Sequence, residues 1–178
     1  MCGGCLAALA LLCAPALAGK ATDNAKDGAK ILEEGKLTLA AVIGAAEADT
    51  KGKACCVTVA KKDAGFVFAV HTHADGKCTV AHVDKSGKVT SKMDAKPEDC
   101  KDAKCGDASK MMTDSKLSLA TAVGAAEADT KGKATAATCD GNGCMVAVVA
   151  DGKVWNVTVG KDGKVGKKDE EKPPVKGG

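Results

Sequence analysis

Apolar residues recur at helical spacing in two stretches of the chain that have nearly the same sequence. Residues 36–54 are KLTLAAVIGAAEADTKGKA and residues 116–134 are KLSLATAVGAAEADTKGKA, so 15 of 19 positions are identical at an offset of 80 residues. Thr38 and Ser118 suit helix N-caps, because their hydroxyls accept bonds from the first N–H groups of a helix. Each copy then places four apolar residues on one helix face: Leu39, Val42, Ile43 and Ala46, and again Leu119, Ala122, Val123 and Ala126.

Downstream of each predicted helix, apolar and polar residues alternate as in antiparallel strands. The predicted strands are 55–60, 66–73 and 78–83 in the first copy, and 135–139, 144–149 and 154–159 in the second. Asp75-Gly76 and Asp151-Gly152 predict tight hairpins. The predicted fold class is therefore α+β, with two repeated modules that each pack one α-helix on a small three- to four-stranded antiparallel sheet.

The two predicted helices each contain an internal glycine, Gly44 and Gly124. Such a glycine costs about 1 kcal/mol relative to alanine. Its presence at the same place in both copies predicts a close approach between helix and sheet.

The repeat also predicts the domain boundaries. The first repeat spans 29–93 and the second 109–166, with a polar linker at 94–108 and a charged tail at 167–178 that we expect to be disordered. Residues 1–18 carry an apolar run and end in Ala-Leu-Ala, the small-x-small pattern of a signal peptidase site. We therefore expect an extracytoplasmic protein, periplasmic or secreted, with no membrane span after cleavage. A lipid anchor at Cys13 is less favoured, because Leu12 is large for the position before it.

Charge and aromatic content exclude one class of partner. Lys and Arg together number 26 against 23 Asp and Glu, for a net charge of +3, and all the basic residues are Lys. The aromatic residues are Phe66, Phe68 and Trp155. Nucleic-acid readers rely on Arg forks and aromatic stacking platforms, so we expect no nucleic-acid partner.

Several short motifs together resemble the PepSY family. They are Ala-Glu-Ala at 46–48 and 126–128, Gly-Lys-Ala at 52–54 and 132–134, Asp-Gly-Lys at 75–77 and 151–153, and the closing Asp84-x-x-Gly87-Lys88-Val89. The second repeat departs from the last motif, with Gly160 where Asp84 stands. PepSY domains occur in propeptides of secreted metallopeptidases and in other exported bacterial proteins. The resemblance implies a tandem, non-enzymatic binding module that contacts or inhibits a peptidase, or binds peptide.

Strand register predicts an alternative function for the first repeat. A two-residue loop at Asp75-Gly76 places His73 opposite Cys78 and Ala69 opposite His82, and a four-residue loop at 62–65 places Cys56 opposite His71. One sheet face would then carry Cys56, His71, His73, Cys78 and His82. Cys and His are the usual protein ligands of zinc and copper, so this face is a candidate metal site. The other interpretation is an ordinary solvent-facing strand, with no cofactor.

The remaining thiols suggest disulfides rather than catalysis. Cys139 and Cys144 flank a four-residue turn and should face each other, and Cys100 and Cys105 could close a small loop. A Cys78–His73 nucleophile is a third class of function, but no oxyanion donors are evident beside it. We therefore predict no catalytic residues and no enzyme, and leave the oligomeric state open.

Overall fold

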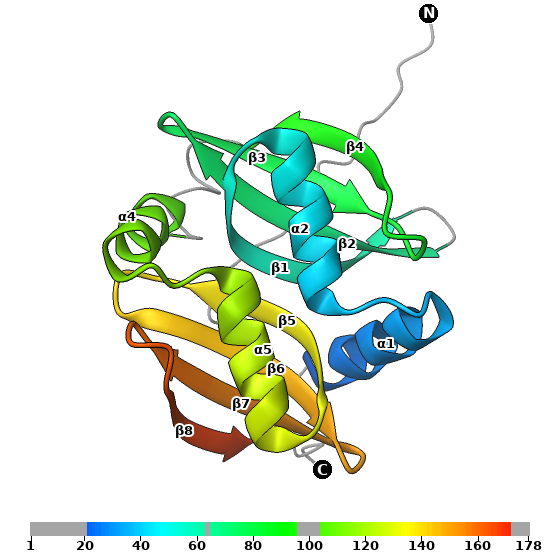
Figure 1. The fold of residues 1–178 in the computed structure, drawn as a ribbon. Coiled ribbons are helices and arrows are strands. Elements are labelled where there is room, and N and C mark those ends of the chain that lie inside the picture. Colours follow the sequence, from blue (N-terminus) through cyan, green and yellow to red (C-terminus); the bar gives the residue numbers. More distant parts are fainter. Residues whose placement is uncertain (1–20, 63–64, 96–103, 172–178) are drawn as a thin grey trace, which may run out of the picture.

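The structure is a computed structural model that describes residues 21–62, 65–95 and 104–171 (Figure 1). The predicted signal segment 1–18, residues 96–103 of the predicted linker and residues 172–178 of the predicted tail lie outside the described residues. The first half of the chain forms α1 (Ala21–Glu34), α2 (Leu39–Thr50), β1 (Lys53–Lys62), β2 (Gly65–Ala74), β3 (Lys77–Val83) and β4 (Val89–Asp94). The second half forms α4 (Cys105–Ser115), α5 (Leu119–Thr130), β5 (Lys133–Cys139), β6 (Gly143–Ala150), β7 (Lys153–Gly160) and β8 (Val165–Glu170).

The two repeated helices, α2 and α5, form where the sequence predicts them. Thr38 Oγ1 accepts from Ala41 N at 3.1 Å, and Ser118 Oγ accepts from Thr121 N at 3.0 Å. The eight predicted face residues are all fully buried. The expectation for Gly44 and Gly124 is wrong, because both are exposed and an added Cβ would meet nothing within 4 Å.

The strands form one sheet rather than two. Its order is β4-β3-β2-β1-β5-β6-β7-β8, and every pair is antiparallel. The fold class α+β is confirmed, but the sheet is larger than expected because β1 and β5 pair. Val57 lies opposite Ala137, its own counterpart at the offset of 80 residues. An antiparallel pair in which a residue faces its own counterpart has a two-fold axis at that point, so the halves are related by an approximate two-fold rotation.

Two further helices, which the sequence analysis did not predict, exchange between the halves. α1 packs on β5 and β6 of the second half, whereas α4 packs on β1 and β2 of the first half. At Gly28 of α1 an added Cβ would lie 2.7 Å from Val59 Cγ2 and 3.2 Å from Thr135 Cβ, so a side chain there would collide with the sheet. The four described helices lie on the same face of the sheet in Figure 1, which makes a two-layer fold.

Two predicted boundaries require correction. α4 begins at Cys105, inside the segment expected to be a linker. β8 continues to Glu170, four residues into the segment expected to be a disordered tail, because its backbone pairs with β7 through Glu170↔Trp155.

Candidate functional site

The predicted Cys/His face is present in the first half. His73 pairs with Cys78, Ala69 with His82, and Cys56 with His71, so all three predicted pairings are confirmed. Residues directly opposite in an antiparallel pair share a face. The five candidate residues therefore lie on one side of β1, β2 and β3, the side opposite the helices.

The chemical state of this face does not suit a metal ion. Cys56 and Cys78 are both disulfide-bonded. The sulfur that ligates metal is the thiolate, so these two positions offer no strong ligand in the oxidised protein. Among residues 21–62, 65–95 and 104–171, no group of three or more His, Cys, Asp or Glu side chains is arranged to hold a metal ion. The same disulfide at Cys78 removes the thiolate that a Cys78–His73 nucleophile would need.

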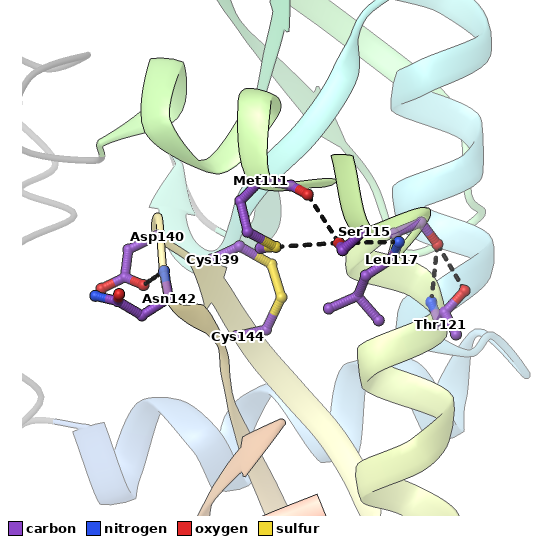
Figure 2. Close-up of a disulfide and its surroundings, with 9 residues drawn as sticks. Met111, Ser115, Leu117, Thr121, Cys139, Asp140, Asn142 and Cys144 are labelled. Carbon is purple, nitrogen blue, oxygen red and sulfur yellow. Dashed lines mark hydrogen bonds between the residues drawn. A yellow bond between two sulfur atoms is a disulfide. The ribbon is translucent and has the colours of Figure 1, made fainter. Parts of the chain in front are cut away.

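The predicted hairpin disulfide is present. Cys139 and Cys144 face each other across the β5–β6 hairpin with Cα atoms 4.0 Å apart. Figure 2 shows this bond with Met111 and Ser115 of α4 among its surroundings. Both cysteines are almost fully buried, at 1% and 2% exposure, which makes the bond a structural link rather than an exchange site.

The other predicted pairing, Cys100 with Cys105, is wrong. Cys100 lies outside the described residues, and Cys105 bonds Cys55, 50 residues away along the chain. The physical reason is the helix exchange: α4 lies over β1, which brings the two Cα atoms to 5.4 Å. Cys55, which the sequence analysis paired with no other cysteine, is fully buried in the core and anchors α4.

The two repeated glutamates have a structural task that the sequence did not reveal. Glu47 Oε1 accepts from Ala54 N at 2.8 Å, and Glu127 Oε1 accepts from Ala134 N at 2.9 Å. Each carboxylate thereby holds the buried N–H group at the start of β1 or β5. Both glutamates therefore serve the backbone at the point where a helix is followed by a strand.

A shallow depression lies at one end of the second half, with a volume of about 430 Å³. Its lining includes two acidic and two basic side chains: Asp107, Asp114, Lys110 and Lys161. Their charges cancel over a short distance, so the depression presents no single charge that would select a ligand.

The clearest binding feature is the outer edge of β4. Ala95 N donates to Cys78 O at 2.9 Å, and Val80 and His82 of β3 pair with Met93 and Ser91 of β4. Backbone groups along an antiparallel strand alternate between the two neighbours. Residues 91, 93 and 95 therefore bond β3, and the N–H and C=O groups of Lys92 and Asp94 point outward from the sheet. Met93, on the face opposite the helices, is 50% exposed beside this edge.

The opposite edge, β8, is more heavily charged. Glu171 N donates to Val154 O, so by the same alternation the outward backbone groups are those of Lys168 and Glu170. Three ion pairs cover β8: Lys167–Asp169 at 2.9 Å, Lys168–Asp129 at 2.7 Å and Lys153–Glu170 at 2.9 Å. Among residues 21–62, 65–95 and 104–171, β4 has one ion pair, Lys92–Asp49 at 2.8 Å. Charged side chains are the usual protection of an edge strand against added strands, so β4 is the less protected edge.

The turn that leads into β4 is held by Asp84. Its Oδ1 accepts from Ser86 Oγ at 2.6 Å, from Ser86 N at 2.8 Å and from Lys88 N at 3.1 Å. The Ser86 hydroxyl is the main cause that lowers the pKa of this carboxyl below its ordinary value. In the second half Gly160 takes the place of Asp84, and Asp162 Oδ1 instead accepts from Lys164 N at 3.1 Å. The same backbone turn is therefore held by an aspartate two positions later.

Comparisons with known proteins place the chain in no established family. No family model matches the sequence, and no curated protein matches it. Among solved structures, one described as a "putative lipoprotein" from Clostridium difficile 630 is similar at 15% identity and a TM-score of 0.40. The similarity covers 72% of this chain and 90% of that chain, and at this TM-score it carries no argument about function. Within the described residues, no helix is both long and apolar enough to cross a membrane.

Proposed function

We propose that the protein is an extracytoplasmic, non-enzymatic binding module that accepts an extended peptide segment as an additional strand beside β4. The observation that carries the proposal is the outward row of backbone groups at Lys92 and Asp94, on an edge that has one ion pair among the described residues. Strand addition of this kind obtains its affinity from main-chain hydrogen bonds.

The expected source of the peptide follows from the sequence. The signal-like residues 1–18 favour export, and the PepSY-like motifs favour an extended segment of a secreted peptidase. The exposed Met93 of β4 would lie beside the added strand, on the face opposite the described helices. The half-buried His82, which bonds Ser91 Oγ through Nδ1 at 2.9 Å, lies on the same face but one strand further in, on β3.

A matched pair of proline variants tests the site. Lys92→Pro removes an outward N–H from β4, and Lys168→Pro removes one from β8. Both substitutions also delete a lysine paired with a helix aspartate, Asp49 or Asp129, at 2.8 and 2.7 Å respectively. Because proline is tolerated on an edge where the N–H faces solvent, the two variants should lose similar, small amounts of stability.

The probe is an array of ten-residue peptides drawn from secreted metallopeptidases, with binding measured by amide chemical shifts in NMR. We expect the shifts to centre on Lys92 and Asp94, and affinity to fall by about tenfold or more in Lys92→Pro because a hydrogen bond is lost and the proline ring intrudes. Lys168→Pro should bind as the wild type does. Equal losses in both variants, or shifts that lie away from β4, would rule out this edge.

Metal binding by the Cys/His face is a second proposal, and it applies to the reduced protein. The confirmed register of Cys56, His71, His73, Cys78 and His82 is the observation that favours it. Calorimetric titration with zinc and with copper, before and after reduction, should give heat only after reduction. Absence of binding in both states would remove the proposal.

A further inference from the structure

The two exchanged helices are anchored differently, although they occupy equivalent places. α4 is held on β1 by the Cys55–Cys105 disulfide and by Lys53 Nζ, which donates to Thr113 Oγ1 at 3.0 Å. At the offset of 80 residues, the counterparts of Cys105 and Cys55 are Ala25 and Thr135. α4 is therefore locked covalently to the first half, whereas α1 rests on the second half by packing alone at this position.

α1 also buries few of its side chains against the sheet. Leu32 is its large side chain that is fully buried, and Ala25 is 6% exposed. The helix backbone approaches Val59 and Thr135 closely at Gly28. The segment that joins α1 to α2 includes Lys36 at φ 52°, a left-handed conformation that residues other than glycine adopt at a cost. An extended connection at Lys36 would relieve this cost.

We propose that the surface beneath α1 accepts the same helix from a second copy of the chain, which gives a dimer in which the two α1 helices are exchanged. The bound helix itself shows what fits this surface, because a second copy supplies identical side chains at Ala25, Gly28 and Leu32. Exchange of an identical element recovers every contact that was broken and so is a low-cost route to dimers. α4 cannot exchange in the oxidised protein, because its disulfide ties it to its own chain.

Cross-linking between two variants of the full chain, each with one added cysteine, tests the exchange. One carries Ala25→Cys and the other Thr135→Cys, the positions equivalent to the native Cys105 and Cys55. The two chains are mixed at high concentration, incubated, oxidised and separated on a non-reducing gel. We expect a covalent heterodimer at several times the yield of a control mixture of Ala25→Cys with Thr158→Cys, since Thr158 is exposed and lies on the sheet face away from the helices.

A second measurement starts from the wild type, which carries no substitution that could disturb folding. Wild-type chains with and without isotopic label are mixed, and native mass spectrometry follows the formation of mixed dimers. The double variant Ala25→Cys/Thr135→Cys, oxidised at low concentration, should remain monomeric at concentrations where the wild type dimerises. A wild type that stays monomeric throughout, or heterodimer yields equal to those of the Thr158→Cys control, would overturn the proposal.

Discussion

Loss of the Cys55–Cys105 bond is expected to destabilise the protein about twice as much as loss of the Cys139–Cys144 bond. The perturbation in each case is a double substitution to alanine, which leaves no unpaired thiol from the pair. The first bond joins residues 50 apart and the second joins residues 5 apart. Loop-closure entropy then predicts a stabilisation of about 4 kcal/mol for the first and about 2 kcal/mol for the second at 25 °C. The value for the first bond assumes no other cross-link within its loop, so it is an upper value in a chain whose Cys56 and Cys78 are also disulfide-bonded.

The comparison between the two variants is stronger than either value alone. All four cysteines are at most 2% exposed, so the cavity left by Cys→Ala contributes similarly in both cases. Urea unfolding at 25 °C, followed by far-UV circular dichroism and by Trp155 fluorescence, gives the free energy of unfolding and the m-value of each variant. If Cys55→Ala/Cys105→Ala loses no more stability than Cys139→Ala/Cys144→Ala, then α4 does not tie the halves together in the way described.

Two further outcomes follow from single residues. Gly44→Ala should stabilise the protein by about 1 kcal/mol because the new methyl group meets no neighbour, and Gly124→Ala should do the same; differential scanning calorimetry of each variant measures this as a raised melting temperature. Gly132→Ala is the contrasting control: its Cβ would lie 2.6 Å from Val148 Cγ1, so this substitution should lower the melting temperature. Glu47→Ala should cost about 1–3 kcal/mol in urea unfolding because the buried Ala54 N–H loses its acceptor, whereas Glu47→Gln, which retains an acceptor oxygen, should cost less; equal losses would show that the carboxamide cannot take over this bond.

Local rules in the sequence were sufficient for the helix caps and the hairpin registers. Asp75-Gly76 fixes a two-residue loop, and a loop of known length determines every pairing along β2 and β3. Thr38 and Ser118 cap their helices because a hydroxyl oxygen at that position can accept a hydrogen bond from the first turn of the helix without help from any distant residue. The face that carries Cys56, His71 and Cys78 was therefore predictable, although the oxidation state of its sulfurs was not.

Contacts between the halves could not be predicted in this way. β1 and β5 carry the same apolar alternation, which suits either an edge or a central strand, so nothing in it indicates that they pair. α1 and α4 are mostly polar and bury few large side chains, Leu32 in α1 and Met111 and Met112 in α4, so their pattern resembles a linker. The spacing of Cys105, Ala108 and Met112 along one helix face was the available signal for α4.

The crossing of α1 and α4 has a consequence for the origin of the gene. Before duplication, a single copy of about half this length would have had its leading helix on one side and the sheet that receives it on another. Such a copy could bury that helix only by pairing with a twin around the axis that now passes between Val57 and Ala137. The chain thus holds, within one polypeptide, the kind of two-fold symmetry that a homodimer has, and the Cys55–Cys105 bond, which has no counterpart at Thr135 and Ala25, distinguishes its two halves.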